Sequence, residues 1–198
     1  AGDFLYRKMC EIGLKTEKHP VVLDGWEFFG ATLRYQTEKG ERCIRLGGYQ
    51  TEMRVSNLQT ELVDAGKGTE KDFLKTDVRG KIALIRINQR DEWWINYPAC
   101  QAHLAGAVAV IAVQDKGYGE VDPAALNAQD ICGLPDAPAF SMSKADMADV
   151  LAAMKKGRLA VTLDADSRVR EKITTYNIVG TIPGQTSQMI AVSAHYDS

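Results

Sequence analysis

The sequence predicts an α/β protein with a mixed β-sheet and short helices, and three observations support this fold class. Residues 81–87 and 107–113 are compact apolar runs typical of buried strands, and a helical pattern at 96–105 separates them. Such a strand–helix–strand unit implies a parallel pair with a right-handed crossover. A short strand at 137–142 leads into a helix, and an N-terminal helix and a C-terminal β-hairpin flank this central module.

The N-terminal part predicts one helix followed by strands. Residues 3–12 place Leu5, Met9 and Ile12 on one helical face. Gly13 follows them, as expected where a glycine in the left-handed conformation ends a helix. Apolar or alternating stretches then predict strands at residues 26–35, 43–46 and 53–63.

Turn and capping residues delimit the central elements. Residues 77–80 predict a turn before the first buried strand, and Pro98 lies in the first turn of the following helix, where its missing N–H is not needed. Ser143 predicts the N-cap of the last helix, with Asp146 as the acid of a capping box. The apolar face of that helix is then formed by Met147, Val150, Leu151 and Met154.

The C-terminal part is β-rich. A strand is expected at 159–163, and residues 173–182 form a second, longer stretch of this kind. Pro183 and Gly184 predict a turn, after which residues 188–194 predict a returning strand. The two would form a hairpin whose second strand leads directly into a histidine.

Composition excludes several classes of function. The chain has 198 residues, of which 45% are apolar and 25% are charged, as in ordinary soluble globular proteins. Its net charge of -2 gives no electrostatic basis for binding nucleic acid. The longest apolar run, residues 104–113, is well short of the ~20 residues that span a bilayer, so no membrane span is predicted.

The compartment stays open on sequence grounds. The chain opens directly into an amphipathic stretch, with no signal peptide. Its cysteines are widely separated and include no Cys-x-x-Cys pair; they are Cys10, Cys43, Cys100 and Cys132. Their even number permits disulfides, but free buried thiols are expected.

An apolar run at residues 189–194 ends in His195, Tyr196 and Asp197. Residues two apart on a strand share a face, so His195 and Asp197 would lie over the same site at the strand's C-terminal edge. A carboxylate there commonly fixes the tautomer of a metal-binding imidazole. The alternative is a histidine at a strand end beside an incidental aspartate. Because zinc sites use three or four protein ligands, the remaining ligands would lie outside this chain, which predicts a fragment of a larger metalloenzyme.

Three other motifs favour structural roles. Residues 66–69, Gly-Lys-Gly-Thr, lack the spacing of a phosphate-binding loop. Cys100 and His103 could form half a metal site, but a helix face packed on the sheet is the favoured interpretation. Trp93 and Trp94 would form either a binding lip or a buried aromatic cluster, and the cluster is favoured.

Two C-terminal motifs stand close together, YNIVGTIPG at residues 176–184 and SAHYDS at residues 193–198. They resemble the entry to the catalytic domain of the co-catalytic zinc aminopeptidases, the family of bacterial leucyl aminopeptidase and glutamate carboxypeptidase II. In that family the two strands are adjacent and the histidine binds zinc. The resemblance implies that His195 is a zinc ligand and Asp197 its supporting carboxylate, with two zinc ions in the full-length protein and none expected in this chain.

The central module carries four further motifs, VDAGKGT at 63–69, DVRGKIALI at 77–85, AGAVAVI at 105–111 and DAPAFS at 136–141. They resemble the protease-associated (PA) domain that many members of the same family insert ahead of these strands. The resemblance divides the chain into an N-terminal part of the peptidase domain at 1–43, a PA domain at 44–170 and the truncated start of the catalytic domain at 171–198.

The resemblance also implies a function for the full-length protein, zinc-dependent hydrolysis of a peptide bond, with amino-terminal cleavage expected. The PA domain would shape substrate access or mediate protein interaction. The implied partners are a peptide or protein substrate and the remainder of the peptidase domain, and the chain alone is expected to be inactive. The alternative is a non-enzymatic recognition module of the transferrin-receptor type. A secreted or periplasmic location follows from the resemblance alone.

Because His195 is the one zinc ligand expected in this chain, we predict that the isolated chain binds zinc weakly or not at all. Calorimetric titration of the metal-free chain with zinc measures this directly. One-to-one binding with a sub-micromolar dissociation constant, abolished in His195→Ala, would contradict the interpretation of the chain as one corner of a larger site.

Overall fold

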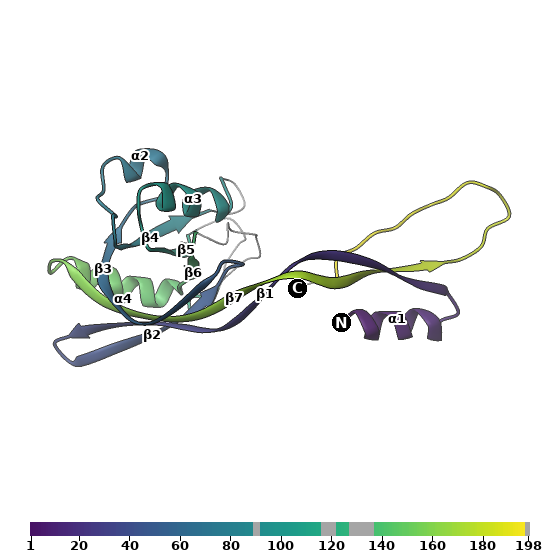
Figure 1. Ribbon diagram of the computed structural model, residues 1–198, viewed down its shortest axis with the longest axis horizontal. Helices are drawn as coiled ribbons and strands as arrows, with labels where there is room; N and C mark the ends of the chain where they lie inside the picture. The colour runs from purple at the N-terminus through teal and green to yellow at the C-terminus, as the bar shows by residue number, and fades with distance from the viewer. Residues whose placement is uncertain (89–91, 116–121, 127–136, 197–198) are drawn as a thin grey trace. The chain divides into compact units, whose positions relative to one another are not determined.

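The computed structural model describes residues 1–88, 92–115, 122–126 and 137–196. The chain forms two compact units, and each is described separately. The larger unit comprises Trp26–Val169, and the smaller unit comprises Ala1–Gly25 and Arg170–Ser198. Figure 1 labels the helices and strands in chain order. Among the described residues, no helix is long and apolar enough to cross a membrane.

The strands of the described residues close into a barrel in the order β1-β2-β6-β5-β4-β3-β7. The strands are β1 (Lys15–Thr37), β2 (Gly40–Gly48), β3 (Met53–Asp64), β4 (Ile82–Ile87), β5 (Ala109–Gln114), β6 (Ala139–Ser141) and β7 (Leu159–Thr181). The helices of the larger unit are α2 (Glu70–Phe73), α3 (Asn96–Leu104) and α4 (Lys144–Met154). The predicted mixed sheet with short helices is therefore confirmed.

Parallel pairing is confined to one part of the barrel. β4 pairs in parallel with β3 and β5, and β5 pairs in parallel with β6. The pairs β1–β2, β2–β6 and β3–β7 are antiparallel. The parallel pair expected on either side of the helix is thus confirmed as β4 and β5, in a register that runs from Ile82 opposite Ala109 to Ile87 opposite Gln114.

β5 is buried on both faces because its alternate side chains enter two separate apolar cores. Ile111 and Val113 enter the first core, whereas Val110 and Ala112 enter the second. A continuous apolar run of this kind is typical of a parallel strand that is covered on both sides. Val150 of α4 packs into the first core, and the apolar face predicted for this helix packs against it. Small residues of α3 pack into the second core.

Capping residues set the helix boundaries of the larger unit. The Ser143 side chain accepts a hydrogen bond from the backbone N–H of Asp146 at 3.0 Å, which confirms the predicted N-cap of α4. A second cap was not predicted, the capping box that Thr69 and Asp72 form at α2. Gly68 before it has a φ of +71°, and a Cβ at this position would lie 2.7 Å from the Cβ of Pro98, so only glycine fits here.

Asp164 of β7 holds a bulge in β3. The β3–β7 register shifts between Val55 and Leu58, and Asn57 takes a left-handed φ of +54°. One carboxylate oxygen of Asp164 accepts the Asn57 N–H at 2.7 Å, and the other accepts a bond from Arg34 at 2.8 Å. The Arg34 guanidinium also donates to the Asn57 side chain at 2.7 Å. The Asn57 N–H first, and then Arg34, hold the pKa of Asp164 below its usual value.

The smaller unit contains α1 (Gly2–Glu11), the first part of β1, the last part of β7 and the C-terminal residues. α1 ends as the sequence predicts, at Gly13 with a φ of +86°. The Gly13 N–H bonds to the Cys10 carbonyl at 3.0 Å, and the Leu14 N–H bonds to the Met9 carbonyl at 3.1 Å. These two bonds together form a Schellman motif, which satisfies carbonyls at the helix end.

The predicted C-terminal hairpin is not formed. β7 continues to Thr181 and so confirms the strand expected at 173–182, but residues 188–194 lie in no strand. Met189, Ile190 and Val192 in this segment are 87%, 94% and 94% exposed. An apolar run becomes a strand only where a neighbouring backbone bonds to it and other side chains cover it. The prediction was wrong because composition does not reveal whether such a neighbour is present.

The three cysteines among the described residues are free but less buried than expected. Cys10 and Cys43 are exposed, and Cys100 is half-buried. Cys132 lies outside the described residues. Cys43 is exposed because β2 turns its alternate residues, among them Ile44, into the first core and leaves the others outside. The expectation of buried thiols was therefore wrong for Cys10 and Cys43.

We predict that amide hydrogen exchange is slow in β4 and β5 and fast at residues 188–194. The two strands are buried and paired on both sides, whereas the C-terminal segment is exposed and outside any strand. Exchange followed by mass spectrometry on the intact chain measures both. Uniform protection of all three segments would show that the C-terminal segment packs cooperatively with the rest.

We also predict that Asp164→Asn destabilises the chain by about 1 kcal/mol near neutral pH, because hydrogen bonds to a charged but partly exposed acceptor are weakened. The folded pKa of Asp164 lies below the ordinary value of 3.8. Its contribution is therefore complete above that value and is lost as the pH falls through the folded pKa. Denaturant unfolding of both proteins, at neutral pH and in strong acid, measures the difference.

Asp149→Asn is the matched control for this prediction. Asp149 also pairs with an arginine, Arg42 at 3.0 Å, but it is more exposed, and Arg42 keeps a second partner in Asp146 at 3.5 Å. A much smaller change is expected, since exposed ion pairs contribute little. If both variants lost the same free energy of unfolding, the stability of the bulge would not depend on Asp164.

Candidate functional site

The residues predicted from the sequence to form the site belong to the end of the smaller unit. His195 is exposed and lies in no strand, so its imidazole is not presented at a strand edge as expected. Asp197 lies outside the described residues. The support that Asp197 would give to His195 therefore stays a prediction.

The described residues contain no group of three His, Cys, Asp or Glu side chains that could hold a metal ion. The imidazole of His195 is of the right chemistry, because zinc commonly takes a neutral histidine nitrogen. The number of ligands is insufficient, because a zinc site needs three or four from the protein. In the described part of the chain, His195 is therefore a residue of a type that zinc takes, but it belongs to no complete metal site.

A polar cluster in the smaller unit joins α1, β1 and β7. The Lys18 ammonium of β1 forms an ion pair with Asp3, and it lies 5.2 Å from the ring centroid of Tyr6 and 5.4 Å from that of Tyr176. Their hydrogen bond lowers the pKa of Asp3 and raises the pKa of Lys18. The hydroxyl of Tyr196 donates to the backbone carbonyl of Tyr176. The residue that follows His195 is thereby attached to β7.

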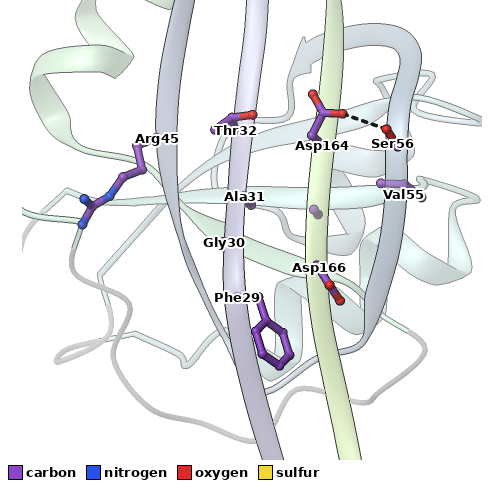
Figure 2. A pocket seen from close by; sticks show the side chains of 10 residues that line it. Phe29, Gly30, Ala31, Thr32, Arg45, Val55, Ser56, Asp164 and Asp166 are labelled. Carbon is purple, nitrogen blue, oxygen red and sulfur yellow. Dashed lines mark hydrogen bonds between the residues drawn. The ribbon is translucent and has the colours of Figure 1, made fainter.

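A hollow of the larger unit lies between β1, β3 and β7 (Figure 2). Small side chains at Gly30, Ala31 and Ala165 leave room for a cavity of about 390 Å³. The other residues that line it are Phe29, Thr32, Arg45, Val55, Ser56, Asp164 and Asp166. Figure 2 shows Asp164 directed toward Ser56 and Arg45 pointing away from both aspartates.

Both carboxylates at this hollow already have cationic partners. Asp164 pairs with Arg34, and Asp166 accepts two bonds from Arg168 at 2.9 and 2.8 Å, which lower the pKa of Asp166. The Arg168 guanidinium also lies 4.8 Å from the ring centroid of Phe29. Since the carboxylates are neutralised in place, the hollow suits an apolar side chain better than it suits proton transfer.

A second groove lies between α2 and α3. Leu74 and Leu104 line it and are 79% and 71% exposed. Glu70, Asp77 and Arg79 also line it. The groove therefore combines two exposed apolar side chains with charged ones.

The helix motif at Cys100 and His103 does not pack on the sheet as expected. Cys100 is half-buried and His103 is exposed, whereas Pro98, Ala99 and Ala102 form the buried face of α3. The prediction was wrong because a short helix of small residues has almost no apolar periodicity from which its inner face could be read.

The two remaining motifs take structural positions. Residues 66–69 form the loop before α2, and its last residue caps that helix, so they form no phosphate-binding loop at the start of a long helix. Trp93 is half-buried, and its ring lies 5.5 Å from that of Tyr97 in an edge-to-face contact. Trp94 is 43% exposed. Trp93 therefore takes part in an aromatic cluster as predicted, whereas the prediction was wrong for the exposed Trp94.

Sequence reasoning missed both the hollow and the groove. The available signal for the hollow was the pair of small residues Gly30 and Ala31, together with aspartates at alternate positions of one strand, Asp164 and Asp166. These segments are more than a hundred residues apart in sequence, and only the β1–β7 and β3–β7 pairings bring them together.

Comparison with known proteins identifies the central part of the larger unit. Residues 55–150 match the family model of the PA domain. No curated protein matches the chain.

Solved structures match nearly the whole chain. A zinc aminopeptidase from Bacillus subtilis aligns at 25% identity and a TM-score of 0.62, over 90% of this chain and 39% of its own. An aminopeptidase from Aneurinibacillus sp. strain AM-1 aligns at 21% identity and a TM-score of 0.63, over 94% of this chain and 43% of its own. A peptidase M28 precursor from Shewanella amazonensis SB2B aligns at 20% identity and a TM-score of 0.65, over 89% of this chain and 43% of its own.

The chain thus spans about two fifths of the length of the structures it matches. The alignments cover both units, because nine tenths of the chain or more is included in the first two. The shared architecture therefore includes the barrel and segments of the smaller unit that precede and follow it in the sequence. Residues 55–150 are a PA domain, in a chain whose fold is that of the corresponding part of zinc aminopeptidases.

Proposed function

We propose that the chain is part of a zinc-dependent aminopeptidase and contributes its PA domain and one ligand of its metal site. The observation that carries this proposal is the match to the Bacillus subtilis zinc aminopeptidase, which includes nine tenths of the chain at 25% identity. The motif SAHYDS at residues 193–198 also supports it, because the motif resembles the strand that carries a zinc-binding histidine in the zinc aminopeptidases.

His195 would bind zinc through one ring nitrogen, and Asp197 would accept a hydrogen bond from the other. The acceptor fixes the tautomer and orientation of the ring and strengthens the imidazole as a ligand. Zinc supplies a Lewis acid that polarises a peptide carbonyl and acidifies a bound water. The other ligands and the general base of such a reaction are not among the described residues, and the chain alone is proposed to be inactive.

The PA domain would act by contact and not by chemistry. The groove beside Leu74 lies within this domain, whereas the hollow is lined partly by the domain and partly by residues 29–32. Both offer apolar surface next to charges that are paired or exposed. Either could bind part of a peptide or protein substrate and so shape access to a peptidase site. We propose residues 44–170 as the extent of this domain, with residues 1–43 and 171–198 belonging to the peptidase domain.

A recognition protein without activity is the second candidate. The specific observation in its favour is the groove between α2 and α3, whose lining includes two exposed leucines. The groove with Leu74 and Leu104 would be the contact surface of such a protein. Zinc content separates the candidates, since a recognition protein of this architecture would have no need of the His195 imidazole.

We predict that His195→Ala in the full-length protein removes zinc and abolishes hydrolysis of aminoacyl substrates, because one ligand is lost. Asp197→Asn should keep the shape of the side chain and weaken metal affinity or activity by roughly 10–100-fold. Zinc content and hydrolysis are measured for the wild type and both variants at equal concentration.

His103→Ala is the control for this experiment, since His103 is an exposed histidine of α3 in the PA domain. It should keep both zinc and activity. If His195→Ala retained full zinc and full activity, His195 would be a structural histidine and the proposed function would fail.

A further inference from the structure

Tyr196 is the point at which the C-terminal segment returns to the body of the smaller unit. All residues from 182 to 195 are exposed, and Tyr196 is half-buried. Its hydroxyl donates a hydrogen bond to the backbone carbonyl of Tyr176, twenty residues earlier on β7. The segment is therefore closed into a loop, with one end continuous with β7 and the other bonded to it.

The surroundings of this phenol come from α1 as well as from β7. A Cβ added to Gly2 would lie 3.4 Å from the Tyr196 hydroxyl oxygen, so the first residue of α1 packs against the phenol. The Tyr176 ring, on the residue that accepts the bond, lies 5.4 Å from the Lys18 ammonium. Lys18 in turn pairs with Asp3 of α1. The bond thus ends on a part of β7 that is itself tied to α1 and β1.

We infer that Tyr196 is a positioning residue for His195. The two are adjacent in the chain, so fixing the Tyr196 phenol on β7 confines the backbone that carries the imidazole. A ligand that is held in place before the metal arrives loses less conformational freedom on binding and binds more tightly. The inference rests on the proposed role of His195 as a zinc ligand, and it adds a supporting role for the residue that follows it.

The test uses Tyr196→Phe in the full-length protein, a change that removes the hydroxyl and keeps the ring. Tyr176→Phe is the matched control, because it removes a neighbouring hydroxyl and leaves the accepting backbone carbonyl intact. The first readout is NMR relaxation of the His195 ring in the zinc-free protein. The second is the zinc dissociation constant, measured by competition with a chelator.

Tyr196→Phe should increase the mobility of the His195 ring and weaken zinc binding by roughly 10-fold, as loss of support behind a ligand does. Activity at saturating zinc should return toward the wild-type value, because the ligand itself is unchanged. Tyr176→Phe should match the wild type in both readouts. Ring mobility and zinc affinity that are the same in both variants would overturn the inference.

Failure of the inference and failure of the proposed function give different results. If His195→Ala removes zinc while Tyr196→Phe changes neither ring mobility nor affinity, His195 is a ligand that Tyr196 does not position. If His195→Ala keeps its zinc, the ligand role fails, and the inference fails with it. A mobile ring in zinc-free Tyr196→Phe would then report a structural bond alone.

Discussion

The fold depends on the burial of β4 and β5 on both faces. Every residue of β5 is buried, and its alternate side chains enter opposite cores. Such a strand is stable only where both faces are covered and neighbouring strands satisfy its backbone groups. Closure of the barrel encloses one core, and α3 covers the other.

The sequence was sufficient to predict the elements around this buried pair. Apolar runs, a proline in a first helical turn and the Ser143 cap are local signals, and each marks a boundary that the structure confirms. Closure of the barrel could not be predicted. β2 pairs with β6 through Gly47 opposite Ser141 and Gly48 opposite Phe140. Neither strand has a sequence pattern from which its partner strand could be identified. The same limitation produced the wrong hairpin, since residues 188–194 have the composition of a strand without a neighbour.

The assignment of His195 and Asp197 to a metal site stays a prediction, and the geometry around His195 could not be predicted. A His-x-Asp pair after an apolar run is short and common, and it points to a metal ligand only through the resemblance of the motifs around it to the zinc aminopeptidases. The hydroxyl of Tyr196, between those two residues, gave no such signal, because its partner is a backbone carbonyl that every residue possesses. The aspartates at the hollow were also missed in the sequence. In the structure, Arg34 and Arg168 neutralise their carboxylates.

The two units differ in how much apolar surface they leave in water. Most of the exposed large apolar side chains among the described residues belong to the smaller unit: Phe4, Ile12, Val22, Leu23, Ile173, Tyr176, Val179, Ile182, Met189, Ile190 and Val192. α1 buries none of its residues. Each Å² of such surface costs about 25 cal/mol, so cover by further protein is strongly favoured. A peptidase domain would supply that cover and the strand neighbours that residues 188–194 lack. Burial of residues 188–194 by such a domain would then order the segment, in addition to the Tyr196 hydrogen bond that already holds its end to β7.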